Sequence, residues 1–263
     1  DLDKAMIGKT VWIVGATSGL GYATAMQLAD NHQVIVSGRN SAALDKMAVH
    51  PNIHAIVMDT TDEEQIKRAV GQIEDQFEDL DCVIYSAGVC HYIDIEHFEL
   101  ETVRQVYEVN VFGSLNLAKH VMPLLKKYHQ KNPDSRPLFA PIASLSTKVP
   151  FSRAQAYGSS KAAMTYWFEA LRVDCHDWLD VTIVNPGFIK TPMIAQNDFS
   201  MPGLMTPEDA ANRLIKGLNK RPLTLDFPKR LAWTLSFFAT FKTLWCRVVG
   251  PQLARADRAN KSK

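Results

Sequence analysis

The hydrophobic pattern alternates between two periods along the chain. Short runs rich in Val, Ile and aromatic residues are separated by longer stretches in which apolar residues recur every three or four positions. This alternation is typical of repeated βαβ units around a buried parallel sheet. It predicts seven strands, at Thr10–Val14, Gln33–Ser37, Ile53–Met58, Asp81–Ser86, Leu138–Ser144, Val181–Asn185 and Leu223–Phe227. The expected fold class is therefore α/β, a Rossmann-type doubly wound parallel sheet of about seven strands with helices on both faces.

Local signals refine these elements. Pro141 lies inside the fifth predicted strand, where a missing N–H donor predicts a bulge or an early end. Residues 61–64 read Thr-Asp-Glu-Glu, a capping box at the start of a helix. A long helix over 100–127 is expected to be interrupted near residues 110–113, and another spans 157–178. The helices are thus predicted to fill the connections between parallel strands.

Length and composition describe one large globular domain. The chain has 263 residues, 46% of them hydrophobic, and a formal net charge of +1, so nucleic acid is not an implied partner. The charge is uneven, because residues 229–263 hold eight basic residues against the single Asp257, a net charge of +7, which leaves −6 for residues 1–228. We therefore expect a single domain over 1–228 and a C-terminal extension over 229–263.

The cysteines and histidines form no metal-binding pattern. Cys82, Cys90, Cys175 and Cys246 are scattered without a Cys-x-x-Cys pair, which favours reduced thiols and a cytoplasmic location. The only ligand-like histidine pair, at 50 and 54, is separated by a proline that argues against a shared helical face. No metal is assigned.

A glycine-rich turn follows the first predicted strand. Residues 15–21 read Gly-Ala-Thr-Ser-Gly-Leu-Gly, and a helical pattern comes next. Glycines here let the backbone approach a pyrophosphate, whose charge is stabilised by free N–H groups at the helix N-terminus. The turn predicts dinucleotide binding, and the alternative is a tight connection without a ligand.

The end of the second strand favours NADP over NAD. An NAD site usually presents a carboxylate to the ribose hydroxyls, but residues 34–39 read Val-Ile-Val-Ser-Gly-Arg. Arg39 would instead form charge-assisted hydrogen bonds to a 2′-phosphate. The alternative is that Arg39 is a solvated turn residue.

Tyr157 and Lys161 are the strongest candidates for chemistry. On a helix, a spacing of four puts both side chains on one face, where the ammonium, together with a cationic nicotinamide, is expected to favour the phenolate and lower the pKa of the tyrosine. Ser144 lies thirteen residues earlier, at the end of a predicted strand, and supplies a hydroxyl donor for a carbonyl oxygen. Taken alone, such a Tyr/Lys pair is common on helices and a strand-end serine often caps a turn.

These motifs, read in order, resemble the short-chain dehydrogenase/reductase family in its small, single-domain branch. The resemblance runs from about Lys9 to Leu218. It rests on Gly15-x-x-x-Gly19-x-Gly21, Asp59, Ser86-Ala87-Gly88, Asn110, Ser144, Tyr157 with Lys161, Asn185-Pro186-Gly187 and Thr191. The sequence departs from the family at Tyr85-Ser86, where an asparagine pair is common, so cofactor contacts are expected to differ there.

The resemblance implies roles in cofactor binding. Asp59 would contact the adenine, Ala87 and Gly88 the adenosine ribose, and Ile189 with Thr191 the nicotinamide carboxamide. The implied cofactor-binding set is Gly15, Thr17, Ser18, Gly19, Leu20, Gly21, Arg39, Asp59, Thr60, Ala87, Gly88, Asn110, Tyr157, Lys161, Pro186, Gly187, Ile189 and Thr191.

The resemblance also implies a catalytic set of four residues. Ser144 would bind the substrate oxygen and Tyr157 would transfer a proton to it. Lys161 would hold the nicotinamide ribose, and Asn110 would help to place a relay water. Such a set catalyses hydride transfer between a nicotinamide cofactor and a carbonyl or alcohol.

Residues 188–205 are expected to cover the substrate. This segment is rich in Phe, Met, Ile and Leu and holds a single acidic residue, Asp198, which favours an apolar substrate. The alternative is that the segment folds against the core.

The C-terminal extension combines aromatic and basic residues. The apolar run over 231–241 is too short to span a bilayer, but with its flanking Lys and Arg it suits a helix at a membrane surface. The alternatives are a helix that closes the substrate pocket and a subunit contact.

The sequence therefore predicts an NADP-dependent oxidoreductase, acting mainly as a reductase of an apolar ketone or aldehyde. The family commonly forms dimers or tetramers through two long helices, so a homo-oligomer is expected. The alternative function is a non-catalytic NADP-binding module that senses redox state and contacts a partner through its basic tail.

Overall fold

Short parallel strands form the centre of the molecule. The structure, a computed structural model, describes residues 10–194 and 201–254. Its strands are β1 (Thr10–Val14), β2 (Gln33–Gly38), β3 (Ile53–Val57), β4 (Cys82–Tyr85), β5 (Leu138–Pro141), β6 (Asp180–Val181), β7 (Ile183–Pro186) and β8 (Thr224–Phe227). Each overlaps a predicted strand, because β-branched residues in these runs suit a fully buried sheet, and the largest shift at the outer end of a predicted strand is at β5, which ends three residues early.

The sheet has the strand order of a doubly wound fold. Six strands pair in parallel in the order β3-β2-β1-β4-β5-β6, and β7 pairs with β8. A bridge between Ile142 and Val184 continues the ladder from β5 to β7, with Ala143 N donating to Val184 O at 2.7 Å. The predicted Rossmann-type parallel sheet is confirmed, and its sixth strand is divided into β6 and β7.

The division occurs opposite Pro141. Two residues before the Ala143–Val184 bond, the same ladder needs an N–H from Pro141 toward Thr182, and proline has none. The strand β5 accordingly ends at Pro141, as the sequence predicts, and the pairing lapses at Thr182.

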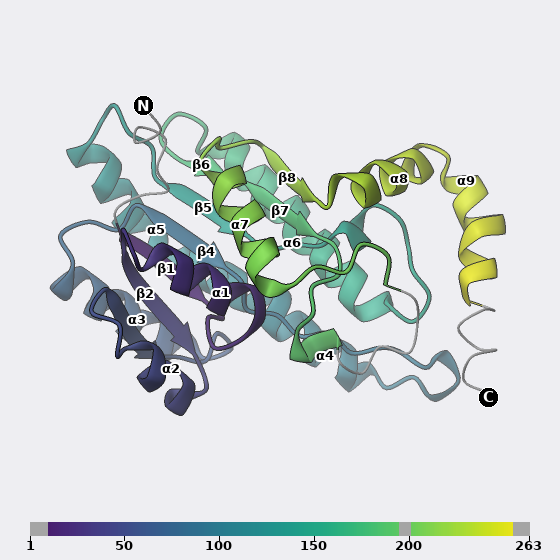
Figure 1. Ribbon diagram of the computed structural model, residues 1–263, viewed down its shortest axis with the longest axis horizontal. Coiled ribbons are helices and arrows are strands. Elements are labelled where there is room, and N and C mark those ends of the chain that lie inside the picture. The colour runs from purple at the N-terminus through teal and green to yellow at the C-terminus, as the bar shows by residue number, and fades with distance from the viewer. Residues whose placement is uncertain (1–9, 195–200, 255–263) are drawn as a thin grey trace.

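Helices cover both faces of the sheet, with α1 and α7 in front of it in Figure 1. One apolar cluster packs α1, α2 and α7 on the face that carries Val11 and Ile13, and the other packs α3, α5 and α6 on the face that carries Trp12 and Val14. The helices are α1 (Gly19–Leu28), α2 (Ser41–Met47), α3 (Glu63–Gln76), α4 (Leu100–Tyr107), α5 (Gly113–Lys131), α6 (Gln155–Asp174), α7 (Pro207–Leu218), α8 (Lys229–Thr240) and α9 (Lys242–Leu244). Alternation along each strand thus divides the core into two layers.

Two predicted helix features turn out differently. The N-cap of α3 is Asp62 rather than Thr61, and its Oδ1 accepts hydrogen bonds from the backbone N–H groups of Glu64 and Gln65 at 3.0 and 3.1 Å. A carboxylate satisfies two free N–H groups there, so the helix begins one residue later than the capping box suggested. The predicted interruption of the long helix is a π-helical turn, η2 (Glu108–Phe112), between α4 and α5.

The C-terminal extension consists of α8, α9 and a π-helical turn, η5 (Trp245–Val249). The direction changes at Phe241, whose φ of −102° and ψ of 51° are not helical, and Figure 1 shows α9 turning away from α8 at one end of the molecule. In the part of the chain that the structure describes, no helix is long and apolar enough to cross a membrane. The basic residues of the extension at positions 255–263 lie outside the described residues.

Candidate functional site

The candidate residues gather where the parallel strands end. Gly15 follows β1, Arg39 follows β2, Asp59 follows β3 and Ser86 follows β4, while Ser144 follows β5 after a short gap. Because all these strands run in the same direction, their carboxyl ends share one edge of the sheet. The fold therefore collects segments that are far apart in the sequence.

Backbone contacts hold the glycine-rich turn. Gly15 has a φ of +87°, and a Cβ there would overlap the backbone of Ala87 on the neighbouring turn. Gly19 has a φ of +56°, and a Cβ there would lie 2.7 Å from Cγ2 of Thr191. The turn is thus enclosed between the predicted ribose-binding and carboxamide-binding segments.

This cradle fits a dinucleotide. Ser18 is the N-cap of α1, and its side chain does not cap the helix. The first N–H groups of α1 therefore have no side-chain acceptor at the cap, and together with the helix dipole they attract an anion such as pyrophosphate. The fit between donor set and glycine cradle is that expected for a phosphate-bearing cofactor.

Arg39 lies beside the same turn. It is exposed and directly follows Gly38, where a Cβ would lie 2.8 Å from Cγ2 of Thr17. The guanidinium is thus carried at the rim of the glycine-rich turn. A specific partner for it is a prediction that the structure does not test.

Three of the implied cofactor residues are already engaged through their side chains. Oδ1 of Asp59 accepts hydrogen bonds from N and Oγ1 of Thr61 at 2.9 and 2.8 Å. The side chain of Thr60 is buried against Tyr85 and Gly113, and that of Leu20 packs in the core. Thr60 and Leu20 thus have their backbone, rather than their side chains, to offer a ligand.

Ser144 and Tyr157 are brought together. Ser144 is the N-cap of a 3₁₀ turn, η3 (Leu145–Thr147), and its Oγ accepts from Ser146 N at 3.1 Å. The same hydroxyl lies close enough to that of Tyr157, in the first turn of α6, to lower the pKa of the phenol. Two hydroxyls thus converge at one point at the ends of the strands, which is the arrangement that binding a carbonyl oxygen requires.

Lys161 is buried beside this pair. Its side chain is 4% exposed, its Nζ donates to Ile142 O at 2.8 Å, and Nζ lies 5.9 Å from the centroid of the Tyr157 ring. A Cβ at Gly88 would lie 3.3 Å from Nζ, so the ammonium abuts the turn after β4. Burial lowers the pKa of Lys161 to about 8, because a low-dielectric site disfavours the charged form.

The pKa of Tyr157 is raised rather than lowered. Burial is the main cause, the nearby Cys90 thiol adds to it, and the hydrogen bond from Ser144 opposes both. Lys161 without a cofactor thus does not lower this pKa, and the lowering expected from Lys161 together with a cationic nicotinamide stays a prediction. Its ammonium donates to a carbonyl and lies toward the ring, so desolvation of the phenol outweighs the cation.

Asn110 is braced rather than free. It lies in η2, fully buried, where its Oδ1 accepts from Val89 N at 2.9 Å and its Nδ2 donates to Val89 O at 3.0 Å and to Ser160 Oγ at 2.9 Å. These bonds tie the turn after β4 to α6. The residue implied to place a water thus uses most of the hydrogen-bonding groups of its side chain to join two parts of the site.

Several residues that sequence reasoning missed support this arrangement. Tyr85 donates to Val109 O at 2.6 Å and so holds the π-helical turn that carries Asn110. Ser160 completes the Asn110 network, and Cys90 lies close enough to influence both Tyr157 and Lys161. Only Tyr85 had a signal in the sequence, because it stands where the family commonly has asparagine.

The predicted substrate segment is divided between core and surface. Ile189 forms a parallel bridge with Met205, and both side chains are buried in the main core. Met193 and Leu204 are exposed, and the predicted Phe199 and Asp198 lie outside the described residues. Part of the segment therefore folds against the core, which was the alternative interpretation.

The C-terminal extension packs against the loop that joins Ser144 to Tyr157. Leu145 and Val149 of this loop form one apolar cluster with Leu235 and Trp245. Trp245 Nε1 also donates to Pro150 O at 2.7 Å.

An ion pair joins the same loop to β8. Lys148 Nζ lies 2.8 Å from Asp226 Oδ2, and Asp226 Oδ1 accepts from Asn185 Nδ2 at 2.8 Å. The loop that joins Ser144 to Tyr157 is therefore held by β8 and by the C-terminal extension.

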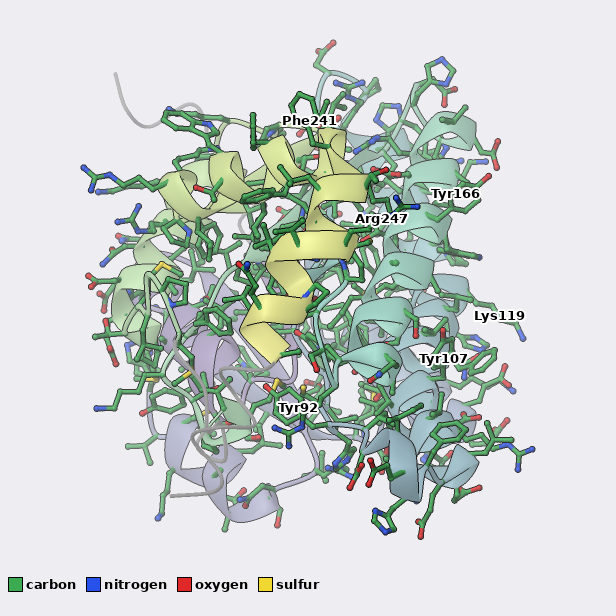
Figure 2. The ribbon with its side chains drawn as sticks, turned by 90° about the vertical axis from the view of Figure 1, so that its right-hand side faces the viewer. Tyr92, Tyr107, Lys119, Tyr166, Phe241 and Arg247 are labelled. Carbon is green, nitrogen blue, oxygen red and sulfur yellow. The ribbon has the colours of Figure 1, made fainter. Side chains whose placement is uncertain are left out.

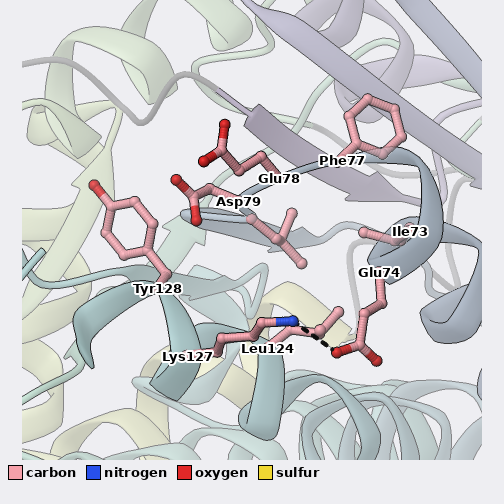
Figure 3. A pocket seen from close by; sticks show the side chains of 9 residues that line it. Ile73, Glu74, Phe77, Glu78, Asp79, Leu124, Lys127 and Tyr128 are labelled. Carbon is pink, nitrogen blue, oxygen red and sulfur yellow. Dashed lines mark hydrogen bonds and ion pairs between the residues drawn. The ribbon is translucent and has the colours of Figure 1, made fainter. Parts of the chain in front are cut away.

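A small hollow lies away from this chemistry (Figure 3). It is lined by residues of α3 and α5 and by Leu80, at the amino end of β4, with Lys127 and Glu74 paired at 3.0 Å across it. Its volume of about 10 Å³ is room for roughly one water. It is at the opposite end of β4 from Ala87 and Gly88, so it is not part of the candidate site.

Comparisons with known proteins agree with this geometry. A family model described as short chain dehydrogenase matches residues 9–200. Serine 3-dehydrogenase from Agrobacterium fabrum is 29% identical over 222 residues, which cover 82% of this chain and 83% of that protein.

Solved structures show the same fold. A short chain dehydrogenase from Burkholderia cenocepacia in complex with NADP has a TM-score of 0.80 at 22% identity, covering 92% of this chain and 98% of that one. NADPH-bound carbonyl reductase from chicken fatty liver has a TM-score of 0.76 at 23% identity, covering 84% and 92%.

Proposed function

The chain belongs to the short-chain dehydrogenase family and is an oxidoreductase of alcohol and carbonyl groups, and on that premise we propose that it is an NADPH-dependent reductase of apolar ketones or aldehydes. The neighbouring hydroxyls of Ser144 and Tyr157 carry this proposal. They sit beside a glycine-rich turn suited to a dinucleotide, so an acid and a hydroxyl donor stand where a carbonyl oxygen would meet the cofactor.

The residues of this site divide the work of reduction. A bound nicotinamide supplies the hydride. Ser144 donates a hydrogen bond to the carbonyl oxygen as negative charge develops on it, and Tyr157 delivers its phenolic proton to that oxygen. The phenol is protonated at neutral pH and can act as the acid, and because its pKa is raised, proton transfer depends on stabilisation of the phenolate that it leaves. Lys161 supplies the cation that stabilises the phenolate left behind.

The preference for NADPH depends on Arg39. It lies at the rim of the glycine-rich turn, and residues 37–44 contain no carboxylate to bind a ribose diol. A guanidinium there favours a 2′-phosphate through charge-assisted hydrogen bonds. The NADP complex of the Burkholderia protein and the NADPH complex of the chicken reductase support this cofactor within the same fold.

The preference for an apolar substrate comes from the described part of the substrate segment. Leu145 and Val149 of the intervening loop are buried against the C-terminal extension, whereas Met193 and Leu204 of the substrate segment are exposed. The Agrobacterium relative is a serine 3-dehydrogenase by name, so a small hydroxy acid is the natural comparison substrate. An apolar wall leaves the charges of such a substrate without partners.

A homo-oligomer is proposed through α5 and α6. Tyr166 on α6 is 77% exposed, Val173 follows two turns later, and Phe112 precedes α5 with half of its surface exposed. Figure 2 shows Tyr107, Lys119 and Tyr166 along one side of the molecule. An apolar patch on two long helices favours a contact between copies.

Oxidation of NADPH in the presence of a carbonyl panel tests the function. The panel contains apolar ketones and aldehydes and polar ketoacids, and serine with NADP⁺ is assayed in the reverse direction. We expect apolar carbonyls to have the highest kcat/KM. Tyr157→Phe should lower kcat about 10³-fold while the Kd for NADPH stays within twofold.

Tyr166→Phe is the matched control, because it removes a hydroxyl from an exposed tyrosine on the same helix. It should keep full activity. Retained activity in Tyr157→Phe would contradict the catalytic role. Preferential turnover of serine would contradict the substrate class alone.

A further inference from the structure

The outer side of the C-terminal extension is an exposed aromatic face. Trp233 is 71% exposed and Phe237 54%, and they are followed by Phe241, Leu244 and Val248. These positions are three or four residues apart, so within each helix they lie on one side. The rings of Phe237 and Phe241 lie 4.9 Å apart, which continues the face across the corner between α8 and α9. Figure 2 looks onto this end of the molecule, with α9 nearest the viewer and Phe241 at its top.

The charges around this face have one sign. Lys229, Arg230, Lys242 and Arg247 are exposed, and residues 227–254 contain no Asp or Glu. Among the described residues, none of these four cations forms an ion pair. The surface therefore offers several solvated cations beside apolar rings, which suits an anionic partner that also has an apolar layer.

The inner side of the same extension is fixed to the protein. Leu235 and Trp245 are buried against the loop between Ser144 and Tyr157, and Trp245 Nε1 donates to Pro150 O. The aromatic face is thus presented by an anchored element, because the opposite side of each helix is already packed. Exposure of the outer rings is then a property of the folded chain.

We propose that this face, formed by Trp233, Phe237, Phe241, Leu244 and Val248 with Lys229, Arg230, Lys242 and Arg247, docks at the surface of a bilayer that contains anionic lipids. Aromatic side chains enter the interfacial region, and Lys and Arg pair with lipid phosphates and carboxylates. The element lies on the bilayer and does not cross it.

Charge complementarity favours a lipid surface over a second copy of the chain. A symmetric contact through this face would bring the four cations of one copy against the same four of the other. Like charges opposed across an interface cost several kcal/mol, so a self-contact would meet repulsion that an anionic bilayer turns into attraction.

Docking would bring the loop between Ser144 and Tyr157 near the bilayer. The inner side of the extension contacts Leu145 and Val149, in the loop between the two hydroxyl residues. An apolar carbonyl dissolved in the bilayer would then enter close to Ser144. This consequence rests on the proposed function, whereas the docking itself does not.

Co-sedimentation of the full chain with vesicles tests the proposal. We expect binding to vesicles of phosphatidylcholine with about 30% phosphatidylserine, little binding to pure phosphatidylcholine, and release as salt rises. Each basic residue contributes about 1 kcal/mol, so Lys242→Gln with Arg247→Gln should weaken partitioning about 30-fold. Trp233→Ser, Phe237→Ser and Phe241→Ser together should weaken it at least tenfold.

Matched controls use equally exposed residues elsewhere. Arg213→Gln with Lys216→Gln removes two cations from α7, and Val49→Ser with Leu223→Ser removes exposed apolar groups outside the proposed subunit contact. Both should bind vesicles within twofold of the wild type. All variants should retain wild-type turnover of a water-soluble carbonyl without vesicles, which separates a failure of docking from a failure of the proposed function.

Two results would overturn the proposal. One is equal partitioning of the wild type and the extension variants. The other is an absence of vesicle binding together with a fall in molar mass, by light scattering, when the three aromatic residues are replaced, because that would identify the face as a subunit contact.

Discussion

The glycine-rich turn is held by backbone against backbone, whereas the Ser144 loop is held by side chains from the far end of the chain. A Cβ at Gly15 would overlap the backbone of Ala87, and neither strand end can move without breaking the sheet. On the other side, Leu145 and Val149 meet Leu235 and Trp245, whose ends can adjust. The cofactor half of the site is therefore held by backbone contacts that leave little room for adjustment, and the substrate half is held by side chains that can shift.

The largest expected effect contrasts a glycine that meets backbone in the cofactor half with one that meets side chains of the substrate half. Gly15→Ala should lower the free energy of unfolding by about 3–5 kcal/mol, because it combines a left-handed φ with overlap of the neighbouring backbone. Gly187→Ala should cost about 1 kcal/mol, because its Cβ would lie 3.0 Å from Pro228 Cδ and 3.1 Å from Leu231 Cδ2, which can shift. Urea unfolding of both variants measures the contrast, and equal losses would remove the distinction between the halves.

Where the halves meet, removing one hydroxyl should affect activity far more than stability. Ser144→Ala should lower kcat/KM by about 10²–10³ through loss of a donor to the developing oxyanion. The loss of stability should be about 0.5–1 kcal/mol, since its Oγ caps the three-residue turn η3. Ser146→Ala, two residues away, is the control for kinetics. A loss of stability large enough to explain the inactivity would argue against a role in binding substrate.

Lys161 links the halves and gives stability a pH dependence. Its pKa is lowered by burial to about 8, against 10.5 for the ordinary side chain, so the folded protein binds this proton less tightly than the unfolded chain. Stability should therefore rise with pH between about 8 and 10.5, with the cost of the buried ammonium fully present below pH 8. Relative to Lys161→Met, the cofactor-free wild type should gain about 1–2 kcal/mol from pH 7.5 to 9.5 in urea unfolding. A difference that does not change with pH would mean that the ammonium is not desolvated.

The smallest effect concerns the rim of the cofactor half. Arg39→Ser should raise the KM for NADPH about tenfold and leave the KM for NADH within twofold, because a single charge-assisted contact is removed. Lys46→Ser, which removes an exposed cation in the last turn of α2, is the control. An equal rise for both cofactors would show that Arg39 acts on the shared part of the dinucleotide.

The sequence by itself determined the succession of strands and of chemical motifs along the chain. Alternating hydrophobic periods fixed the elements of the parallel sheet, and glycines at 15, 19 and 21 marked the turn, because local backbone geometry demands those residues. The proximity of Ser144 to Tyr157 also follows, once parallel strands place their ends at one edge.

Only the tertiary structure decided how these groups behave. In the cofactor-free protein burial raises the pKa of Tyr157 and lowers that of Lys161, and the side chain of Asn110 joins the turn after β4 to α6. Packing of Trp245 beneath Pro150 likewise decided which side of the extension faces outward. Desolvation and long-range contacts depend on residues brought together from distant parts of the chain, so no local pattern records them.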